Sequence, residues 1–211
     1  NGRGGLTLEA NRSYNAFGCE PPAKAALAGR SRHDRFRRRP REELVHVDPQ
    51  SLQQCQDVIG YQFGNPSLLA QALTHASVAP TRLDSNERME FLGDAVLGLV
   101  VCDELFTSQR ELLEGEMTKI KSSVVSRQTC AIIAQQLDLV PLLSMGKGME
   151  RPGGLPQSIA AAVLEAIIGA IYLDGGLDAA RTFVLEHVRP FIRKVLDDQH
   201  ARNYKSILQQ Y

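Results

Sequence analysis

Three carboxylates recur within one short apolar stretch, residues 86–99 (NERMEFLGDAVLGL). At about 100° per residue, a helix would place Glu87, Glu90 and Asp94 on one face, with Asn86 as its N-cap. Apolar residues fill most of the remaining circumference, so the spacing predicts that the acidic face runs into buried surface. Neighbouring buried carboxylates repel one another, and a hard divalent cation held by oxygen ligands relieves that repulsion. The other interpretation is a solvated helix face whose acids favour the helix N-terminus, which explains Asp94 poorly.

A fourth acid stands alone in the most apolar helix that the sequence predicts. Residues 158–173 are apolar almost throughout, which indicates a buried central helix that ends at the glycine pair 175–176. Glu165 is the only charged residue of that segment. A single acid in a buried helix needs a partner, and the acids of residues 86–99 together with a cation are the obvious candidates. This observation favours a metal site over a solvated acidic face.

The stretch 87–97 (ERMEFLGDAVL) resembles the signature of the ribonuclease III family of double-stranded RNA endonucleases. The likeness extends to residues 71–77 (QALTHAS), 114–119 (EGEMTK) and 164–174 (LEAIIGAIYLD), and covers about residues 50–200. It implies an all-α nuclease domain, a multi-helix bundle that forms a homodimer. It also implies a Mg²⁺-dependent enzyme, with Mn²⁺ as a substitute. Such an enzyme cleaves double-stranded RNA to 5′-phosphate products with short 3′ overhangs, as in the processing of rRNA and mRNA precursors.

The resemblance also assigns roles to the acids. It implies that Glu90, Asp94 and Glu165 bind the metal, with Asp94 and Glu165 most directly tied to the chemistry. It places Glu87 and Glu114 in the surrounding shell or at a second metal ion.

Four further residues have two interpretations each. The resemblance places His75 near the RNA, whereas a lone histidine is usually a packed or capping residue. Lys119 and Lys121 lie on different helical faces, so one can reach phosphate while the other is solvated; both are otherwise simple surface lysines. Phe91 matches a residue that packs across the dimer interface, and its alternative is an ordinary core phenylalanine.

One departure from the family pattern concerns the metal ligands. The pattern has an aspartate three residues before the final glutamate, and this chain has Ala162 there. Three readings follow: a Mg²⁺-dependent endoribonuclease, a catalytically silent relative that binds structured RNA, and an all-helical scaffold whose acids are merely solvated. The persistence of all five acids favours the first.

Charge and composition divide the chain into segments. Residues 1–47 carry 10 Lys and Arg against 5 Asp and Glu, and residues 48–211 carry 14 against 19. We expect residues 1–47 to be a basic, disordered extension and residues 48–200 to be the nuclease domain. Residues 201–211 resemble the start of a double-stranded-RNA-binding domain, which would be truncated here.

Cysteine usage and hydropathy bear on the compartment. The cysteines form no C-x-x-C pair, and Cys55, Cys102 and Cys130 fall within apolar helical patterns, where a free thiol packs as a small hydrophobe. We expect a reducing, cytoplasmic location. No apolar run approaching about 18 residues is evident, so we expect no membrane association.

Overall fold

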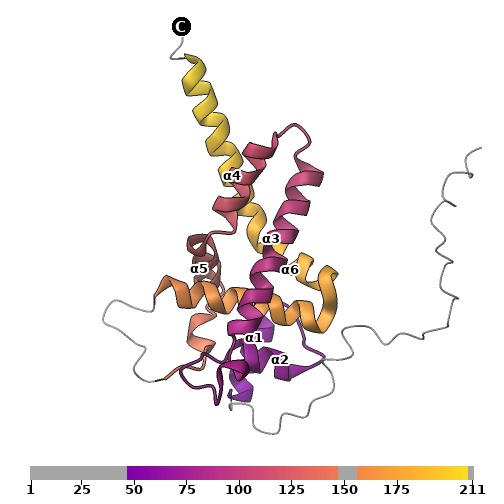
Figure 1. The fold of residues 1–211 in the computed structure, drawn as a ribbon, viewed down its shortest axis with the longest axis vertical. Helices are drawn as coiled ribbons and strands as arrows, with labels where there is room; N and C mark the ends of the chain where they lie inside the picture. Colours follow the sequence, from indigo (N-terminus) through magenta and orange to yellow (C-terminus); the bar gives the residue numbers. More distant parts are fainter. Residues whose placement is uncertain (1–46, 147–155, 209–211) are drawn as a thin grey trace, which may run out of the picture.

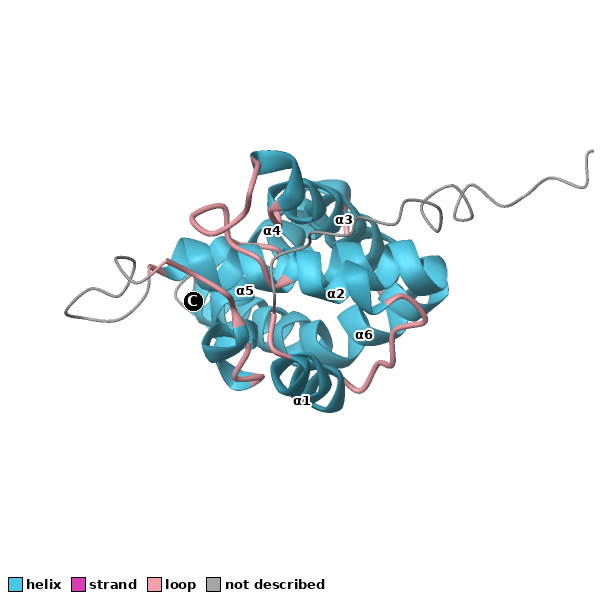
Figure 2. Cartoon of the chain, turned by 90° about the horizontal axis from the view of Figure 1, so that it is seen from below, coloured by secondary structure: helices cyan, strands magenta, loops and turns pink. Residues whose placement is uncertain are grey.

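The computed structural model describes residues 47–146 and 156–208, with side chains as far as residue 198. Within these ranges the chain consists of helices and loops without a strand, and one isolated bridge pairs Thr74 with Ser144 (Figure 2). The all-α prediction is therefore confirmed, while the predicted basic extension lies outside the described residues apart from Val47. The helices are α1 (Pro49–Ile59), α2 (Pro66–Ala72), η2 (Arg82–Asp84), α3 (Glu87–Ser108), α4 (Glu114–Val124), α5 (Arg127–Gln136), η3 (Val140–Leu142) and α6 (Gln157–Leu208).

Polar side chains lie at the starts of α3 and α5. Ser126 caps α5 as predicted, and its Oγ accepts a hydrogen bond from the Thr129 backbone N–H at 3.2 Å. Asn86 occupies the predicted N-cap position of α3, but its side chain makes no capping hydrogen bond. Ser85 Oγ instead accepts from the Glu87 N–H at 3.4 Å. The first N–H of α3 is therefore satisfied by the residue before the N-cap.

Helices α3 and α6 cross with their backbones in contact (Figure 1). A Cβ atom added to Gly93 of α3 would overlap the carbonyl oxygen of Glu165 and lie 2.6 Å from its carbonyl carbon. One added to Gly169 of α6 would overlap the carbonyl oxygen of Met89. Only glycine permits this approach at either position. Residues 159–171 of α6 are largely buried, so the prediction that this segment is the centre of the fold is confirmed.

Helix α6 consists of two segments that meet at Gly176. The backbone there has φ 82° and ψ −172°, in a region that favours glycine, so the predicted break at residues 175–176 is confirmed. Elsewhere in α6 the backbone angles are helical, Pro190 included, and a bend at that proline stays a prediction. Figure 1 shows the first segment passing across α3 and the last part rising beside α4. Two ion pairs hold the second segment against the far half of α3: Arg181 with Asp103, and Arg189 with Glu104 at 2.9 Å.

The apolar character of α6 corrects one prediction. An 18-residue window within residues 157–198 has a mean hydropathy of 1.6, so α6 is long and apolar enough to cross a membrane by composition alone. However, 61% of that window is buried inside the fold, as in the core helix of a soluble protein.

The helix also continues to Leu208 without a boundary near residue 200. The assignment of residues 201–211 to a second domain stays a prediction.

Asp174, at the end of the first segment of α6, binds the loop between α1 and α2. Its carboxylate accepts hydrogen bonds from the Tyr61 hydroxyl at 2.9 Å, the Gly64 N–H at 2.8 Å and the Asn65 N–H at 2.9 Å. These three bonds join residues 109 to 113 positions apart in the sequence. They fix the first two helices to the core helix.

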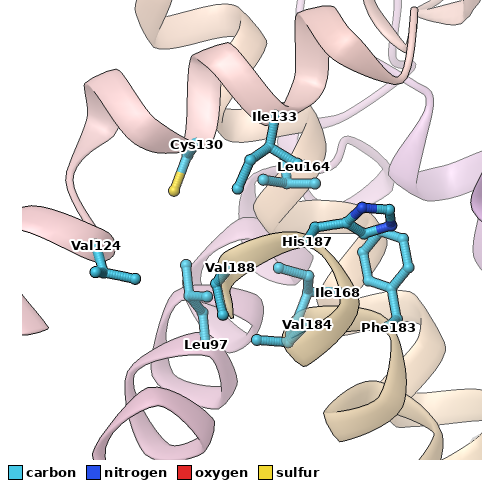
Figure 3. Close-up of a pocket in the computed structure, with 10 residues that line it drawn as sticks. All are labelled: Leu97, Val124, Cys130, Ile133, Leu164, Ile168, Phe183, Val184, His187 and Val188. Atoms are coloured by element: carbon cyan, nitrogen blue, oxygen red, sulfur yellow. The ribbon is translucent and has the colours of Figure 1, made fainter. Parts of the chain in front are cut away.

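A small apolar cavity lies between α3, α4, α5 and the two segments of α6 (Figure 3). His187 lines it and packs edge-on against Phe183 with ring centroids 4.7 Å apart. Its buried Nε2 has no hydrogen-bond partner among the described side chains and backbone. Burial lowers the pKa of His187, so the ring is neutral near pH 7. The thiol of Cys130 borders the same cavity. Because the lining is otherwise apolar, the cavity belongs to the core and lacks the convergent polar groups of a ligand site.

Gly93→Ala is expected to destabilise the fold by about 3 kcal/mol, because α3 and α6 must separate to admit the new methyl group. The measurement is urea unfolding followed by circular dichroism. Gly115→Ala is the matched control, since a Cβ there would meet no heavy atom within 4 Å. The control should be unchanged or up to about 1 kcal/mol more stable. Equal effects of the two substitutions would contradict the importance of the crossing.

Candidate functional site

The acidic face of α3 is partly open to solvent. Glu87 and Glu90 are half-buried and Asp94 is exposed. The partial burial of Glu90 agrees with the prediction that the stripe runs into buried surface, but the prediction is wrong for Asp94. The reason lies in the packing of α3 in the tertiary structure, which leaves the side next to the acids facing outward, as the 81% exposure of Phe91 shows. The acids lie between the buried face of α3 and this open face.

Glu165 lies opposite these acids because the helices cross there. Gly93 contacts the Glu165 backbone and lies within one helical turn of both Glu90 and Asp94 on α3. Glu165 therefore meets α3 at the level of these two acids. Glu165 is half-buried, and burial together with the charges of Asp94 and Glu90 raises the pKa of its carboxyl to about 7. The three predicted metal ligands therefore lie close enough together for the charges of Asp94 and Glu90 to act on Glu165.

Helix α5 contributes two residues that the sequence reasoning missed. Cys130 and Arg127 both lie near enough to lower the pKa of Glu165 slightly. Burial, with the nearby Glu165, raises the pKa of Cys130 to about 12, so its thiol is protonated near pH 7. Burial and Glu87 raise the pKa of Glu90, and the charge of Arg127 opposes that rise. The cap at Ser126 predicted where α5 starts, but nothing in its sequence indicated that this end faces the acids.

Ala162 lies one turn before Glu165 on α6 and is half-buried. Its methyl group offers no ligand where the family pattern has a carboxylate. Among residues 47–146 and 156–198, no three His, Cys, Asp or Glu side chains already surround a common point that would hold a metal ion.

The donor chemistry nevertheless fits a hard divalent cation. Burial raises the pKa of Glu165 most, the charges of Asp94 and Glu90 raise it further, and Arg127 only partly offsets the rise. Uncompensated carboxylates of this kind are typical Mg²⁺ ligands.

The two lysines predicted to contact RNA lie at different distances from the acidic face of α3. Lys121 is half-buried, and its Cε would lie 3.9 Å from a Cβ on Gly98, one turn beyond Asp94 on α3. Lys119 is exposed. Of the two lysines, Lys121 is therefore the one beside the acidic face.

Glu114 lies elsewhere. It begins α4, beyond the far end of α3, on the order of 20 Å from Asp94 along that helix. Its Oε1 accepts a hydrogen bond from the Thr118 hydroxyl at 2.7 Å. The interpretation that Glu114 sits near the metal cluster is wrong within one chain, because α3 separates the two.

His75 stabilises a turn next to the site. Its Nδ1 accepts a hydrogen bond from the Ser77 N–H at 3.1 Å, and the Ser77 hydroxyl accepts one from the Gly146 N–H at 2.9 Å. Because Nδ1 is an acceptor, Nε2 carries the proton of the neutral ring. This geometry gives His75 a local structural role and leaves its RNA contact a prediction.

An exposed apolar stripe follows α3 beside the acidic face. Phe91, Leu99 and Phe106 are 81%, 55% and 74% exposed and recur on one helical face. The alternative of Phe91 as a core residue is therefore wrong. Cys102 lies on the same stripe and is also exposed, so the expectation that it packs as a small buried hydrophobe is wrong.

Comparisons with known proteins agree with this geometry. A family model described as "Ribonuclease-III-like" matches residues 65–191, more than half of the chain. The chain belongs to the ribonuclease-III-like family. Ribonuclease 3 of Rhodopirellula baltica is 46% identical over 160 residues, which are 76% of this chain and 60% of that protein. Ribonuclease 3 of Pelotomaculum thermopropionicum is 43% identical over 157 residues, 72% of this chain and 65% of that protein.

A solved structure supports the same family. The nuclease domain of ribonuclease III from Campylobacter jejuni is 38% identical, with a TM-score of 0.62, and covers 66% of this chain and 96% of that domain. Its description refers to a region involved in dimer formation. The resemblance inferred from residues 87–97 is thus confirmed for the family. This ribonuclease-III-like chain spans about six-tenths of the length of the curated relatives it matches.

Glu165→Gln is expected to stabilise the metal-free chain at pH 8 by on the order of 1 to 3 kcal/mol. Folding raises the carboxyl pKa from its usual 4.5 to about 7, so stability that is present below pH 4.5 is lost as the pH rises through 7. The glutamine variant should lose less stability over this range in urea unfolding with a chelator present. The exposed Glu111→Gln is the control and should follow the native chain. An unchanged pH dependence in Glu165→Gln would contradict the coupling.

Proposed function

We propose that this chain is a divalent-cation-dependent endoribonuclease that cleaves double-stranded RNA to 5′-phosphate products with short 3′ overhangs. The observation that carries the proposal is the convergence of Glu90, Asp94 and Glu165 at the crossing of α3 and α6, where burial and the charges of the other two raise the pKa of Glu165. Relatives named Ribonuclease 3 share 38–46% identity with the chain, which supports the same reaction. The processing of rRNA and mRNA precursors is the corresponding biological role.

Glu90, Asp94 and Glu165 would hold Mg²⁺, or Mn²⁺ in its place. When bound, the cation supplies charge neutralisation at the scissile phosphate and activation of the attacking water. The chain itself provides a rigid frame, because the backbones of the two helices that carry the ligands touch. Exposure of Asp94 leaves that side of the frame accessible to a substrate as large as an RNA duplex.

Residues around the acids suit contact with a phosphate backbone. Lys121 lies beside the acidic face at Gly98, and Arg127 lies near Glu90 and Glu165. Both cations would offset the charge of phosphates brought close to carboxylates. Lys119 and His75 are further candidates for RNA contact. Shape and 2′-hydroxyl contacts, which do not depend on base sequence, would select the duplex.

A homodimer formed through α3 is part of the proposal. The stripe of Phe91, Leu99 and Phe106 exposes large apolar side chains that a second copy would bury. The dimer-forming region named for the Campylobacter jejuni nuclease domain supports the same arrangement. If Glu114 contributes to a metal site, that site belongs to the other subunit, because its own acids lie on the order of 20 Å away.

Ala162 favours a second candidate function, a catalytically silent relative that binds structured RNA. A metal site with three carboxylates in place of four should bind Mg²⁺ more weakly, although this ion commonly keeps several waters as ligands. The two candidates differ in whether bound RNA is cut.

The deciding experiment incubates the purified chain with an end-labelled RNA duplex and Mg²⁺, then Mn²⁺. We expect staggered cuts by the native chain and a loss of at least about 100-fold in rate for Glu165→Gln, since a ligand to the cation is removed. Ala162→Asp should lower the Mg²⁺ concentration for half-maximal rate by about tenfold. Binding without cuts under either metal, with cuts restored only by Ala162→Asp, would favour the silent RNA-binding relative.

Phe91→Glu is expected to raise the dissociation constant of the dimer by about 30-fold or more, because it places a charge in an apolar interface. Analytical ultracentrifugation over a range of concentrations measures this constant. Val58→Glu is the control, since Val58 is 37% exposed but lies on α1 and not on α3. Equal weakening by both variants, or by neither, would argue against an interface along α3.

A further inference from the structure

The short turn η2, which leads into α3, is tied to α2 by hydrogen bonds. Nε2 of Gln71 on α2 donates to the carbonyl oxygens of Leu83 at 3.0 Å and Ser85 at 3.3 Å. The carbonyl oxygen of Thr74, just after α2, accepts a hydrogen bond from the Asn86 N–H at 2.9 Å. Thr74, Ser85 and Asn86 are buried. The backbone of the turn is therefore fixed against α2 where α3 begins.

The turn is also closed by its own hydrogen bonds, yet it presents a cation to solvent. The Thr81 hydroxyl donates to the Asp84 carboxylate at 2.6 Å, and the Ser85 hydroxyl donates to the Arg82 carbonyl oxygen at 2.8 Å. The side chain of Arg82 is nevertheless 85% exposed. Because the backbone that carries Arg82 is already ordered, less conformational freedom is lost when its side chain binds a ligand.

Arg82 lies at one end of the acidic face of α3. Its Nη1 is 3.9 Å from Oε1 of Glu87, the first residue of α3. This distance is an ion pair without a hydrogen bond, so the N–H donors of Nη1 can bind another anion, and an exposed pair of this kind contributes little stability. Lys121 lies at the other end of the acidic face, beside Gly98. The carboxylates therefore have a cation at each end of their row.

We propose that Arg82 binds a phosphate of the RNA duplex and anchors the strand beside the acidic face, with Gln71 holding the turn in place. This inference rests on the proposed function. Asp94 lies two turns after Glu87, on the order of 10 Å along α3, so a guanidinium beside Glu87 reaches a neighbouring phosphate and not the scissile one. Its planar group of N–H donors matches phosphate oxygens, and its charge offsets the repulsion between RNA and the acids.

The test compares Arg82→Gln, which removes the charge, with Arg82→Lys, which keeps it. The dissociation constant for an RNA duplex is measured by fluorescence anisotropy over a series of KCl concentrations. All chains carry Glu165→Gln, and a chelator is present, so that the duplex stays uncut. We expect Arg82→Gln to weaken binding by about tenfold and to lower the slope of log Kd against log salt by about one, as for one lost phosphate contact. Arg82→Lys should keep the slope and lose only part of the affinity.

Arg193→Gln is the matched control, because Arg193 is also exposed but lies on the second segment of α6. It removes the same charge and should change the dissociation constant by less than about twofold, since it removes no phosphate contact. Equal losses of affinity and slope in Arg82→Gln and Arg193→Gln would overturn the proposal, because the effect would then depend on net charge alone.

Double variants separate a phosphate contact from an effect through neighbouring residues. If Arg82 only shields Glu87, the loss caused by Arg82→Gln disappears in chains that also carry Glu87→Gln, and the proposal is overturned. We expect the loss to persist. Gln71→Met should weaken binding by about threefold when Arg82 is present and have no effect in Arg82→Gln. Equal weakening in both would contradict the role given to Gln71.

Cleavage with Mg²⁺, by chains that keep Glu165, distinguishes failure of this inference from failure of the proposed function. Arg82→Gln should raise KM for the duplex by about tenfold with little change in kcat, as for a contact made equally in the ground and transition states. Cutting by the native chain with KM and Kd unchanged in Arg82→Gln would overturn the inference alone. Binding without cutting would overturn the nuclease, and the salt series would still decide the role of Arg82. If the native chain neither binds nor cuts the duplex, both fail.

Discussion

The approach of α3 and α6 at Gly93 and Gly169 is the constraint on which the candidate site depends. The backbones touch there, so the acids of the two helices are brought together by main-chain geometry and not by attraction between their side chains. Burial and mutual repulsion both disfavour ionisation of the acids there, and both raise the pKa of Glu165. The free energy for the crossing comes instead from the apolar residues of α6 that surround it, which lie in the buried core.

This arrangement separates the part of the protein that gives stability from the part that gives function. Residues of α6 that face the core are buried and apolar, while Glu165 projects from the same helix toward the acids of α3. Repulsion among the carboxylates is a cost that the core must offset, and a bound cation would remove it. Ala162 lowers that cost, because one acid fewer lies at the crossing. The same substitution weakens the attraction for a cation, so stability of the empty site and affinity for metal change in opposite directions.

Much of the fold could be predicted from local sequence. Apolar periodicity and turn residues gave the helical class, the cap at Ser126 and the break at Gly176, because each depends on a few neighbouring residues. Glu87, Glu90 and Asp94 shared a face as expected. Exposure could not be predicted in the same way: Phe91 and Cys102 have apolar neighbours in sequence, yet the packing of α3 leaves their face uncovered. Cys130, Arg127 and Glu114 were misjudged or missed for a related reason, since their distances from the acids are set by the orientation of whole helices.

The three hydrogen bonds accepted by Asp174 have a consequence for the order in which the chain acquires structure. They join α6 to residues that precede it by more than a hundred positions, so they cannot form on a nascent chain until α6 has left the ribosome. Glu165 emerges with the same helix. Until then, α1, α2 and α3 lack both their anchor and their central packing partner. A ribosome-bound fragment that ends before α6 would therefore carry the acids of α3 without a site, and the folded frame and its candidate chemistry would appear together once α6 has emerged.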